Sequence, residues 1–305
     1  MAFDAFALML AMLALGMLFA RLRVLPANSA ETLNLVVLYV CLPAAILLNV
    51  PKLRFDVSLL ALAALPWLVA GLAWAAVRLL SRRLHFRRDE TVVLVLLTML
   101  GNTSYVGFPM IEALLGPQAL PYAVVYDQFG TFLLLSTAGL VVLAHGSGET
   151  APTPRAIALR ILRFPPTWAL VFGLTLMPEQ PPPWIALALE RLAGVLVMLV
   201  MLAVGLGLQL RMPRDEVRPL AVGLLLKLVL LPLLALPIGW GLGMRGEVLS
   251  VGVLETAMPP MVTAAAMAVA HGQAPRLATA IVGYGIVLSL ATLPLWAAVL
   301  RIVAA

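Results

Sequence analysis

Apolar runs separated by short stretches rich in Arg, Pro and Gly make up almost the whole chain. The hydrocarbon core of a bilayer is about 30 Å thick, so a membrane-spanning helix needs roughly 20 apolar residues. By that measure the pattern predicts about ten spans. Their expected ranges are 4–20, 29–50, 57–81, 91–115, 120–144, 164–178, 184–209, 218–243, 247–270 and 276–302. No run alternates polar and apolar residues as barrel strands do, so the spans are predicted to be helices.

Composition supports an all-α polytopic membrane protein. Of the 305 residues, 63% are hydrophobic and 11% are charged, whereas soluble domains average about 25% charged residues. The mean hydropathy is +1.06. The N-terminal apolar run has Asp4 before it and Arg21 and Arg23 after it. Because a secretory signal carries its positive charges first, we expect a retained first helix.

Metal, disulfide and nucleic-acid roles are not indicated by the pattern. The single Cys41 lies in an apolar span, and His85, His145 and His271 fall at span ends without metal-site spacing. We therefore expect no metal and no cofactor. The net charge of +6 is more typical of topology signals in a membrane protein, so no nucleic-acid partner is expected.

The distribution of basic residues predicts the orientation. With the N-terminus outside, fourteen Lys and Arg residues lie in inner connections and five in outer ones. The positive-inside rule therefore predicts a multi-pass protein with both termini outside. The inner set is Arg21, Arg23, Arg78, Arg82, Arg83, Arg87, Arg88, Arg155, Arg160, Arg163, Arg211, Arg214, Arg218 and Arg276; the outer set is Lys52, Arg54, Arg191, Arg245 and Arg301.

The two halves of the chain resemble each other weakly. "LPAAILLN", ending at Asn49, is similar to "LAVGLGLQ", which ends 160 residues later, and "QFGTFLLLSTAGL" is similar to "GYGIVLSLATLPL", 155 residues later. Five spans in each half would give the repeats opposite orientations. The sequence thus predicts a first five-helix repeat at 1–144, a short basic cytoplasmic connection at 145–163 and a second, inverted repeat at 164–305.

Two spans at equivalent positions of these repeats are interrupted. Span 4 reads "LTMLGNTSYVGFPMIEALLG", and span 9 reads "LETAMPPMVTAAAMAVAHG" with Pro259 and Pro260 in its middle. Span 4 is interrupted at Gly101-Asn102-Thr103-Ser104 and resumes as an apolar stretch that contains Pro109. A proline removes a backbone hydrogen bond and clashes with the preceding turn, so two in succession should interrupt span 9. Proline kinks stabilised by neighbouring helices are the alternative, but paired interruptions in an inverted repeat favour a transporter binding site.

Polar side chains near the breaks are candidates for binding. The second halves of spans 4 and 9, opening near Ser104 and Met261, would present helix N-termini to a carboxylate. Asn102 and Thr103 could add hydrogen bonds. The candidate substrate-binding residues, with those that the family motif below adds, are Asn102, Thr103, Ser104, Pro109, Gln128, Pro259, Pro260 and Met261.

Three charged residues lie within spans, where charge is costly and usually functional. Asp127, Glu255 and Lys227 are therefore candidates for the coupling of a proton or a sodium ion. The structural alternative is an ion pair, either between Asp127 and Lys227 or between Glu255 and Lys227. No residue is assigned a catalytic or metal-binding role.

The segments "GNTSYVGFPMIEALLG", "AVVYDQFG" and "ETAMPPMVTAAAMAVAHG" resemble the auxin efflux carrier family, which includes plant auxin exporters and bacterial carriers of malonate and malate. The most specific part is the pattern formed by Asn102, Thr103, Gly107 and Pro109. The resemblance implies that helices 4 and 9 cross at mid-membrane and that substrate binds near the crossing. It also implies a dimeric scaffold of helices 1, 2, 6 and 7, and a transport domain of helices 3–5 and 8–10 that moves in an elevator-like cycle.

These observations predict a secondary active transporter of a small organic anion, working as a homodimer in the bacterial inner membrane. A sodium-coupled symporter of the bile-acid type, a cation/proton antiporter of related fold and a non-transporting sensor are alternatives. An enzyme is not expected, because no span interior contains histidine and neither HExxH nor GxSxG occurs.

Overall fold

The computed structural model describes residues 2–53, 57–208, 210 and 215–303. The basic residues Arg54, Arg211 and Arg214 of the predicted charge pattern lie outside this set. Within the described residues the chain is helical, and the only extended pairing is an isolated antiparallel bridge between Gly101 and Pro260. The prediction of an all-helical protein is therefore confirmed for the described part of the chain.

The chain divides into two compact units. The first unit comprises Met1–Phe55, Ser104–Val124 and Arg160–Leu208, and the second comprises Asp56–Thr103, Val125–Leu159 and Gln209–Ala305. Neither unit is a continuous half of the chain, because each takes segments from before and after residue 150. The division therefore follows individual helices and not the order of the two predicted repeats.

The first unit is built mainly from eight α-helices and several short η segments of π or 3₁₀ geometry. They are α1 (Ala2–Leu22), α2 (Ser29–Val36), η1 (Val37–Cys41), α3 (Leu42–Asn49), η2 (Val50–Lys52), α6 (Phe108–Leu115), η4 (Pro117–Ala119), α7 (Leu120–Val125), the end of α10 (Pro154–Leu162), α11 (Pro165–Thr175), α12 (Pro183–Gly194) and α13 (Leu196–Gly207). The π segment η3 (Thr103–Gly107) begins at the last residue of one stretch of the second unit and continues into the first.

The second unit contains the remaining elements. They are α4 (Val57–Leu84), α5 (Arg88–Met99), η5 (Tyr126–Thr131), α8 (Phe132–Leu134), η6 (Leu135–Gly139), α9 (Leu140–Ser147), most of α10, α14 (Val217–Leu225), η7 (Leu226–Leu230), α15 (Leu231–Gly241), α16 (Gly246–Thr256), α17 (Val262–Ala270) and α18 (Pro275–Val303). Consecutive elements such as α14, η7 and α15 run on without a gap, so they form single long helices with a local π turn.

Six of the helical segments are long and apolar enough to cross a membrane. They are Ser29–Lys52, Val57–Leu84, Pro117–Ser147, Pro183–Gly207, Val217–Gly241 and Pro275–Val303. The bent pair α10 and α11, which meet at 68°, would make a seventh, and α1 contains a shorter apolar helix at Ala7–Leu22. Among the described residues, these lengths and compositions fit a multi-pass membrane protein.

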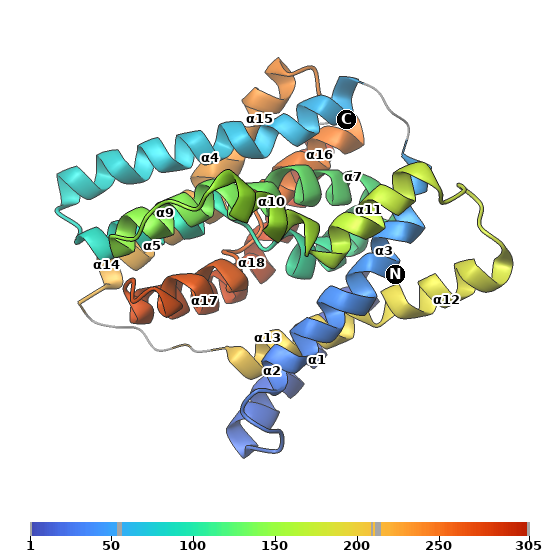
Figure 1. Cartoon of the computed structure of the whole chain (residues 1–305), viewed down its shortest axis with the longest axis horizontal. Helices are drawn as coiled ribbons and strands as arrows, with labels where there is room; N and C mark the ends of the chain where they lie inside the picture. Colours follow the sequence, from blue (N-terminus) through green and yellow to red (C-terminus); the bar gives the residue numbers. More distant parts are fainter. Residues whose placement is uncertain (1, 54–56, 209, 211–214, 304–305) are drawn as a thin grey trace. The chain divides into compact units, whose positions relative to one another are not determined.

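Helix packing in the first unit depends on small residues. α1 lies beside α13 (Figure 1), and a Cβ atom on Gly16 would lie 2.4 Å from the carbonyl oxygen of Leu202. Gly205 on α13 approaches α1 as closely, because a Cβ atom added to it would lie 2.3 Å from the Leu13 carbonyl oxygen. Small residues at a helix–helix contact let the two backbones approach in a membrane. A side chain at either glycine would therefore push α1 and α13 apart.

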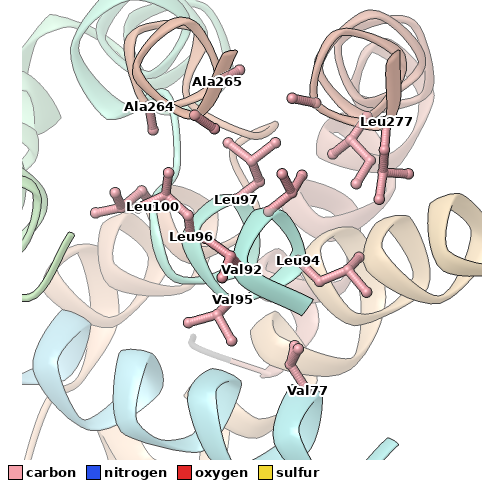
Figure 2. Close-up of a cluster of buried hydrophobic side chains, with 14 of the residues drawn as sticks. Val77, Val92, Leu94, Val95, Leu96, Leu97, Leu100, Ala264, Ala265 and Leu277 are labelled. Carbon is pink, nitrogen blue, oxygen red and sulfur yellow. The ribbon is translucent and has the colours of Figure 1, made fainter. Parts of the chain in front are cut away.

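The core of the second unit surrounds α5. The side chains of Val92, Leu94, Val95, Leu96 and Leu97 leave this helix in several directions and are buried. Figure 2 shows them directed toward neighbouring helices that carry Val77 on α4, Ala264 and Ala265 on α17, and Leu277 on α18. A helix that is apolar all round is a buried one. α5 therefore ends inside the core of the second unit, and the interruption of span 4 begins there.

The connection before α5 is held by an ion pair. Arg87, which stays half exposed, bonds Glu216 with a 3.0 Å N–O distance. Hydrogen bonds with Asp89 and Glu216 raise the pKa of Arg87, which stays charged. Within the second unit, Arg87 therefore ties the connection between α4 and α5 to the segment before α14.

Candidate functional site

The two interrupted spans pair with each other at their breaks. α5 ends at Met99 and α16 ends at Thr256, and beyond these ends Gly101 and Pro260 form an antiparallel bridge. The breaks are joined by two backbone hydrogen bonds, from Asn102 N–H to the Pro259 carbonyl (2.8 Å) and from Met261 N–H to the Leu100 carbonyl (3.1 Å). Buried backbone groups need partners, and each break supplies them to the other. The second helical halves then begin at Thr103 and Val262, within two residues of the predicted starts.

Two glycines permit the close approach of side chains at this crossing. A Cβ atom on Gly101 would lie 3.1 Å from Lys227 Nζ, so the absence of a side chain leaves room for the ammonium. On α18, a Cβ atom on Gly285 would lie 2.6 Å from Pro260 Cδ. The breaks are thus packed directly against η7 and α18 within the second unit.

Asp127 is one of two buried carboxylates near the crossing. It lies on η5, is 1% exposed and accepts hydrogen bonds from Thr103 Oγ1 (2.5 Å) and Gln128 Nε2 (2.7 Å). These bonds connect a residue of span 5 to the first residue of the second half of span 4. Hydrogen bonds to a charged acceptor are the stronger ones in proteins. Asp127, Thr103 and Gln128, all predicted site residues, are therefore brought together.

Lys227 places a cation against the same crossing. Its Nζ donates to the main-chain carbonyl of Thr256 at 3.1 Å, and the side chain is 3% exposed. The Thr256 hydroxyl donates to Gly252 O (2.8 Å) and lies 3.0 Å from the Tyr126 hydroxyl, which therefore donates to it. An ammonium has three N–H donors, and the Thr256 carbonyl is the one acceptor found for them among the described residues.

Glu255 is the second buried carboxylate, and its surroundings differ from those of Asp127. It is 0% exposed, and neither carboxylate oxygen has a hydrogen-bond partner among the described residues. Coulombic interactions couple it to Asp127 and to Lys227. Two further buried atoms at the crossing, Asn102 Nδ2 and Gln128 Oε1, also have no hydrogen-bond partner in the part of the chain that the structure describes. Buried polar groups are normally satisfied, so this concentration needs a functional explanation.

The buried polar residues lie on irregular helix turns. Thr103 begins η3, Asp127 and Gln128 lie on η5, and Lys227 lies on η7, each a π-helical segment. A π turn holds one extra residue and frees a backbone carbonyl, and such turns occur often at functional sites. Three helices are thus distorted where they carry polar side chains.

Comparison with known proteins identifies the kind of protein. A family model for membrane transport proteins matches residues 1–297. The chain belongs to this family. The resemblance of its sequence to auxin efflux carriers, which form this family, is thereby confirmed. The protein is a membrane transporter and not an enzyme.

Two similar proteins are also described as transporters. An uncharacterized transporter of Methanothermobacter thermautotrophicus is 32% identical over 294 residues, which cover 95% of this chain and 96% of the relative. An uncharacterized transporter of Methanocaldococcus jannaschii is 24% identical over 245 residues, 77% of this chain and 78% of the relative. Both matches extend over most of each chain, so the similarity to transporters is not confined to one segment.

The structure of the transporter gathers most of the predicted residues. Asn102, Thr103, Gln128, Pro259, Pro260, Met261, Asp127, Glu255 and Lys227 all lie in the second unit, around the paired breaks. Ser104 and Pro109 belong to the first unit, and Ser104 follows Thr103 directly in η3. The ammonium of Lys227 contacts Thr256 O and no carboxylate oxygen of Glu255.

Sequence reasoning missed Tyr126 and Thr256. Each precedes or follows a predicted site residue directly, and together they link η5 to the end of α16 through their hydroxyl groups. The signal available in the sequence was that each lies beside a buried carboxylate: Tyr126 directly precedes Asp127, and Thr256 directly follows Glu255. Neither hydroxyl carries charge, so charge alone could not have drawn attention to them.

The first unit of the transporter contains a separate cavity of about 700 Å³. Pro109 lines it, together with Asn49, Lys52, Glu112 and Glu190. Glu112 is exposed. The lining mixes one lysine with two glutamates, so this cavity has no excess of positive charge for an anion.

Proposed function

We propose that the transporter is a secondary active carrier of a small organic anion, and that the anion binds where the two broken helices pair. One observation carries this proposal: the crossing holds buried hydrogen-bond donors for which the described part of the chain supplies too few acceptors. Among the described residues, the Asn102 amide nitrogen has no partner, and Lys227 has one acceptor for three N–H groups. A carboxylate has two oxygens and about four lone-pair sites, so it would satisfy both groups.

Helix geometry supports an anion at the same place. α17 is nine residues long and begins after Met261, which forms no side-chain cap. The first N–H groups of a helix lack internal partners and carry partial positive charge, which favours a carboxylate. The adjacent Asn102 amide extends this set of donors. The side chains of Pro259 and Pro260 carry no hydrogen-bond acceptor, so they do not compete with an anion for these donors.

The proposed architecture has ten spans in two inverted repeats. The helices that pair at their breaks are the fourth and the ninth of the ten predicted spans, which supports this count. The division of the chain supports a scaffold and a transport domain, because spans 1, 2, 6 and 7 fall in the first unit, whereas spans 3 and 8–10 fall in the second. Span 4 is divided between the units after Thr103, and span 5 belongs to the second unit from Val125 onward. In the proposed elevator cycle, the transport domain carries the anion across. The carrier works as a homodimer in the bacterial inner membrane, with both termini outside.

Flux into proteoliposomes tests this function. Purified protein is first screened by thermal shift with acetate, malonate, malate and indole-3-acetate. A ligand at 100 times its Kd stabilises the folded protein by about 2.7 kcal/mol. Any stabilising acid is then offered as radiolabelled substrate to vesicles. We expect binding and saturable uptake of at least one acid. Binding without uptake would identify a sensor, and the absence of binding by all four would reject the small-carboxylate assignment.

Cysteine labelling tests the orientation. In a Cys41→Ala background, single cysteines in the 82–90 loop should be protected from an impermeant maleimide in intact cells, whereas cysteines in the 178–183 turn should react. The excess of basic residues on the inner side is the physical reason. Labelling of the first loop with protection of the second would reverse the proposed topology.

A further inference from the structure

The crossing holds a lysine and a glutamate that are close enough to interact but do not bond. Lys227 Nζ lies against Gly101 and donates to Thr256 O, while both oxygens of Glu255 lack hydrogen-bond partners within the described part of the chain. Coulombic interactions join Glu255, Lys227 and Asp127 in one electrostatic cluster. Lys227 therefore has donors to offer a ligand, and Glu255 has acceptors that no described residue uses.

The charge of this cluster limits what can bind. Asp127 and Glu255 would contribute two negative charges, and Lys227 contributes one positive charge. Burial makes an uncompensated charge expensive, because the surrounding dielectric is low. Adding a carboxylate to the ionised cluster would raise its net charge from minus one to minus two. An anion should therefore bind only together with a cation.

The cation that fits the described oxygens is a proton. Asp127 is already hydrogen-bonded by Thr103 and Gln128, and the Thr256 carbonyl already accepts from Lys227. A hard metal cation takes about six oxygen ligands, whereas the fully buried side-chain oxygens near the crossing that lack a hydrogen-bond partner among the described residues are the pair on Glu255 and Gln128 Oε1. A proton needs only one of them.

We propose that Glu255 takes up one proton each time a carboxylate binds to Lys227, so that the anion and the proton cross the membrane together. This rests on the proposed function and assigns Lys227 to the substrate and not to an ion site. Protonation of Glu255 removes the negative charge that competes for the lysine, and the substrate carboxylate then accepts the free N–H groups. The proton comes from water on one side and returns to water on the other, so no bond to carbon changes.

The groups that face Glu255 support a single proton acceptor. Asp127, Lys227 and Tyr126 interact with it electrostatically. The elements packed against α16 are α4, α15 and α18. α15 has no titratable residue, α4 has Arg78, Arg82 and Arg83 near one end, and α18 has Arg276 and Arg301 near its ends, with Tyr284 bonded to the Leu210 carbonyl. Glu255 is thus the carboxylate of the cluster that is available for the proton.

Calorimetric titration of the purified protein tests this inference. Malonate, malate, acetate or indole-3-acetate, whichever binds, is titrated at pH 6 to 9 in pairs of buffers that differ in ionisation enthalpy, with choline and then sodium as the cation. We expect close to one proton taken up per anion at the alkaline end. The apparent Kd should then rise about tenfold for each pH unit, without a requirement for sodium.

Variants locate the two charges. Glu255→Gln should bind the same acid with no proton uptake and with a Kd independent of pH. Lys227→Met should raise the Kd about 30-fold or more, as expected for one partner of a buried charged pair, and Lys227→Arg should restore part of the affinity. Glu247→Gln, a half-buried glutamate on the same helix, is the matched control and should behave as the parent.

The outcomes separate this inference from the proposed function. Binding by the parent protein without proton uptake at any pH would overturn the inference and leave the anion carrier intact. Binding that requires sodium would overturn it in favour of a metal ion. The absence of binding by every acid would reject the proposed function itself. The proton count of the parent decides the inference even if a variant fails to fold.

Discussion

Asp127 and Glu255 are two equally buried carboxylates at one crossing, and they differ in their partners. Asp127, from the first half of the chain, accepts two side-chain hydrogen bonds. Glu255, from the second half, accepts none among the described residues. Burial alone therefore does not tell whether a carboxylate is structural. A carboxylate that is bonded on both oxygens stabilises the fold, whereas one that is buried without bonds costs stability and is available for chemistry.

The largest expected effect is a difference in stability between the substitutions of the two carboxylates. Asp127→Ala would leave the Thr103 hydroxyl and the Gln128 amide without their acceptor, so we expect a loss of about 3 kcal/mol or more in the free energy of unfolding. Glu255→Gln removes a desolvated charge with no bonds and should leave stability unchanged or higher. Thermal and denaturant unfolding in detergent measures both. Equal destabilisation by the two substitutions would abolish the distinction drawn between them.

The next prediction compares the two neighbours Asn102 and Thr103. The amide nitrogen of Asn102 has no partner among the described residues. Asn102→Ala should therefore weaken anion binding by roughly 1.5–3 kcal/mol, the range for a hydrogen bond to a charged group, and change stability little. Thr103 is bonded to Asp127, so Thr103→Val should lower stability first. Binding is measured by calorimetry and stability by thermal unfolding. A well-folded Asn102→Ala protein with unchanged affinity would make Asn102 a simple helix cap and displace the proposed site.

The smallest expected effect concerns the hydroxyl bridge between Tyr126 and Thr256. Tyr126→Phe removes one neutral hydrogen bond at 3.0 Å, which is worth about 0.5–1.5 kcal/mol. Thr256 keeps its bond to Gly252 O, so the carbonyl that accepts from Lys227 should hold its position. We expect a small loss of stability and an unchanged Kd for the anion. A large loss of affinity would show that the bridge positions Lys227.

Several local features could be predicted because their causes are local in sequence. Two consecutive prolines break a helix wherever it lies, and the predicted break at Pro259 and Pro260 lies within the non-helical residues 257–261. The starts of the second helical halves were predicted within two residues. Within the predicted basic connection at 145–163, the structure has the helix α10 at Pro154–Leu162. Its arginine-containing apolar run was too short to be recognised as a separate helix.

Pairings between distant residues could not be predicted in this way. We considered ion pairs of Lys227 with Asp127 or with Glu255, because opposite charges in apolar spans attract each other. In the structure the Lys227 ammonium bonds the main-chain carbonyl of Thr256. A backbone carbonyl is present at every residue, so nothing in the sequence marks this one as the acceptor. The same holds for Gly101, whose missing side chain makes room for the ammonium.

By itself, the sequence determined that the protein is a helical transporter with two interrupted spans, because hydropathy, proline and motif spacing act through neighbouring residues. It also determined which buried side chains carry charge. Only the tertiary structure decided which of them are satisfied. Asp127 finds Thr103 at a separation of 24 residues, and Tyr126 finds Thr256 at a separation of 130. Hydrogen bonds depend on the distance and the angle between donor and acceptor. Both are set by how the helices pack, and the order of the helices along the chain does not specify that packing.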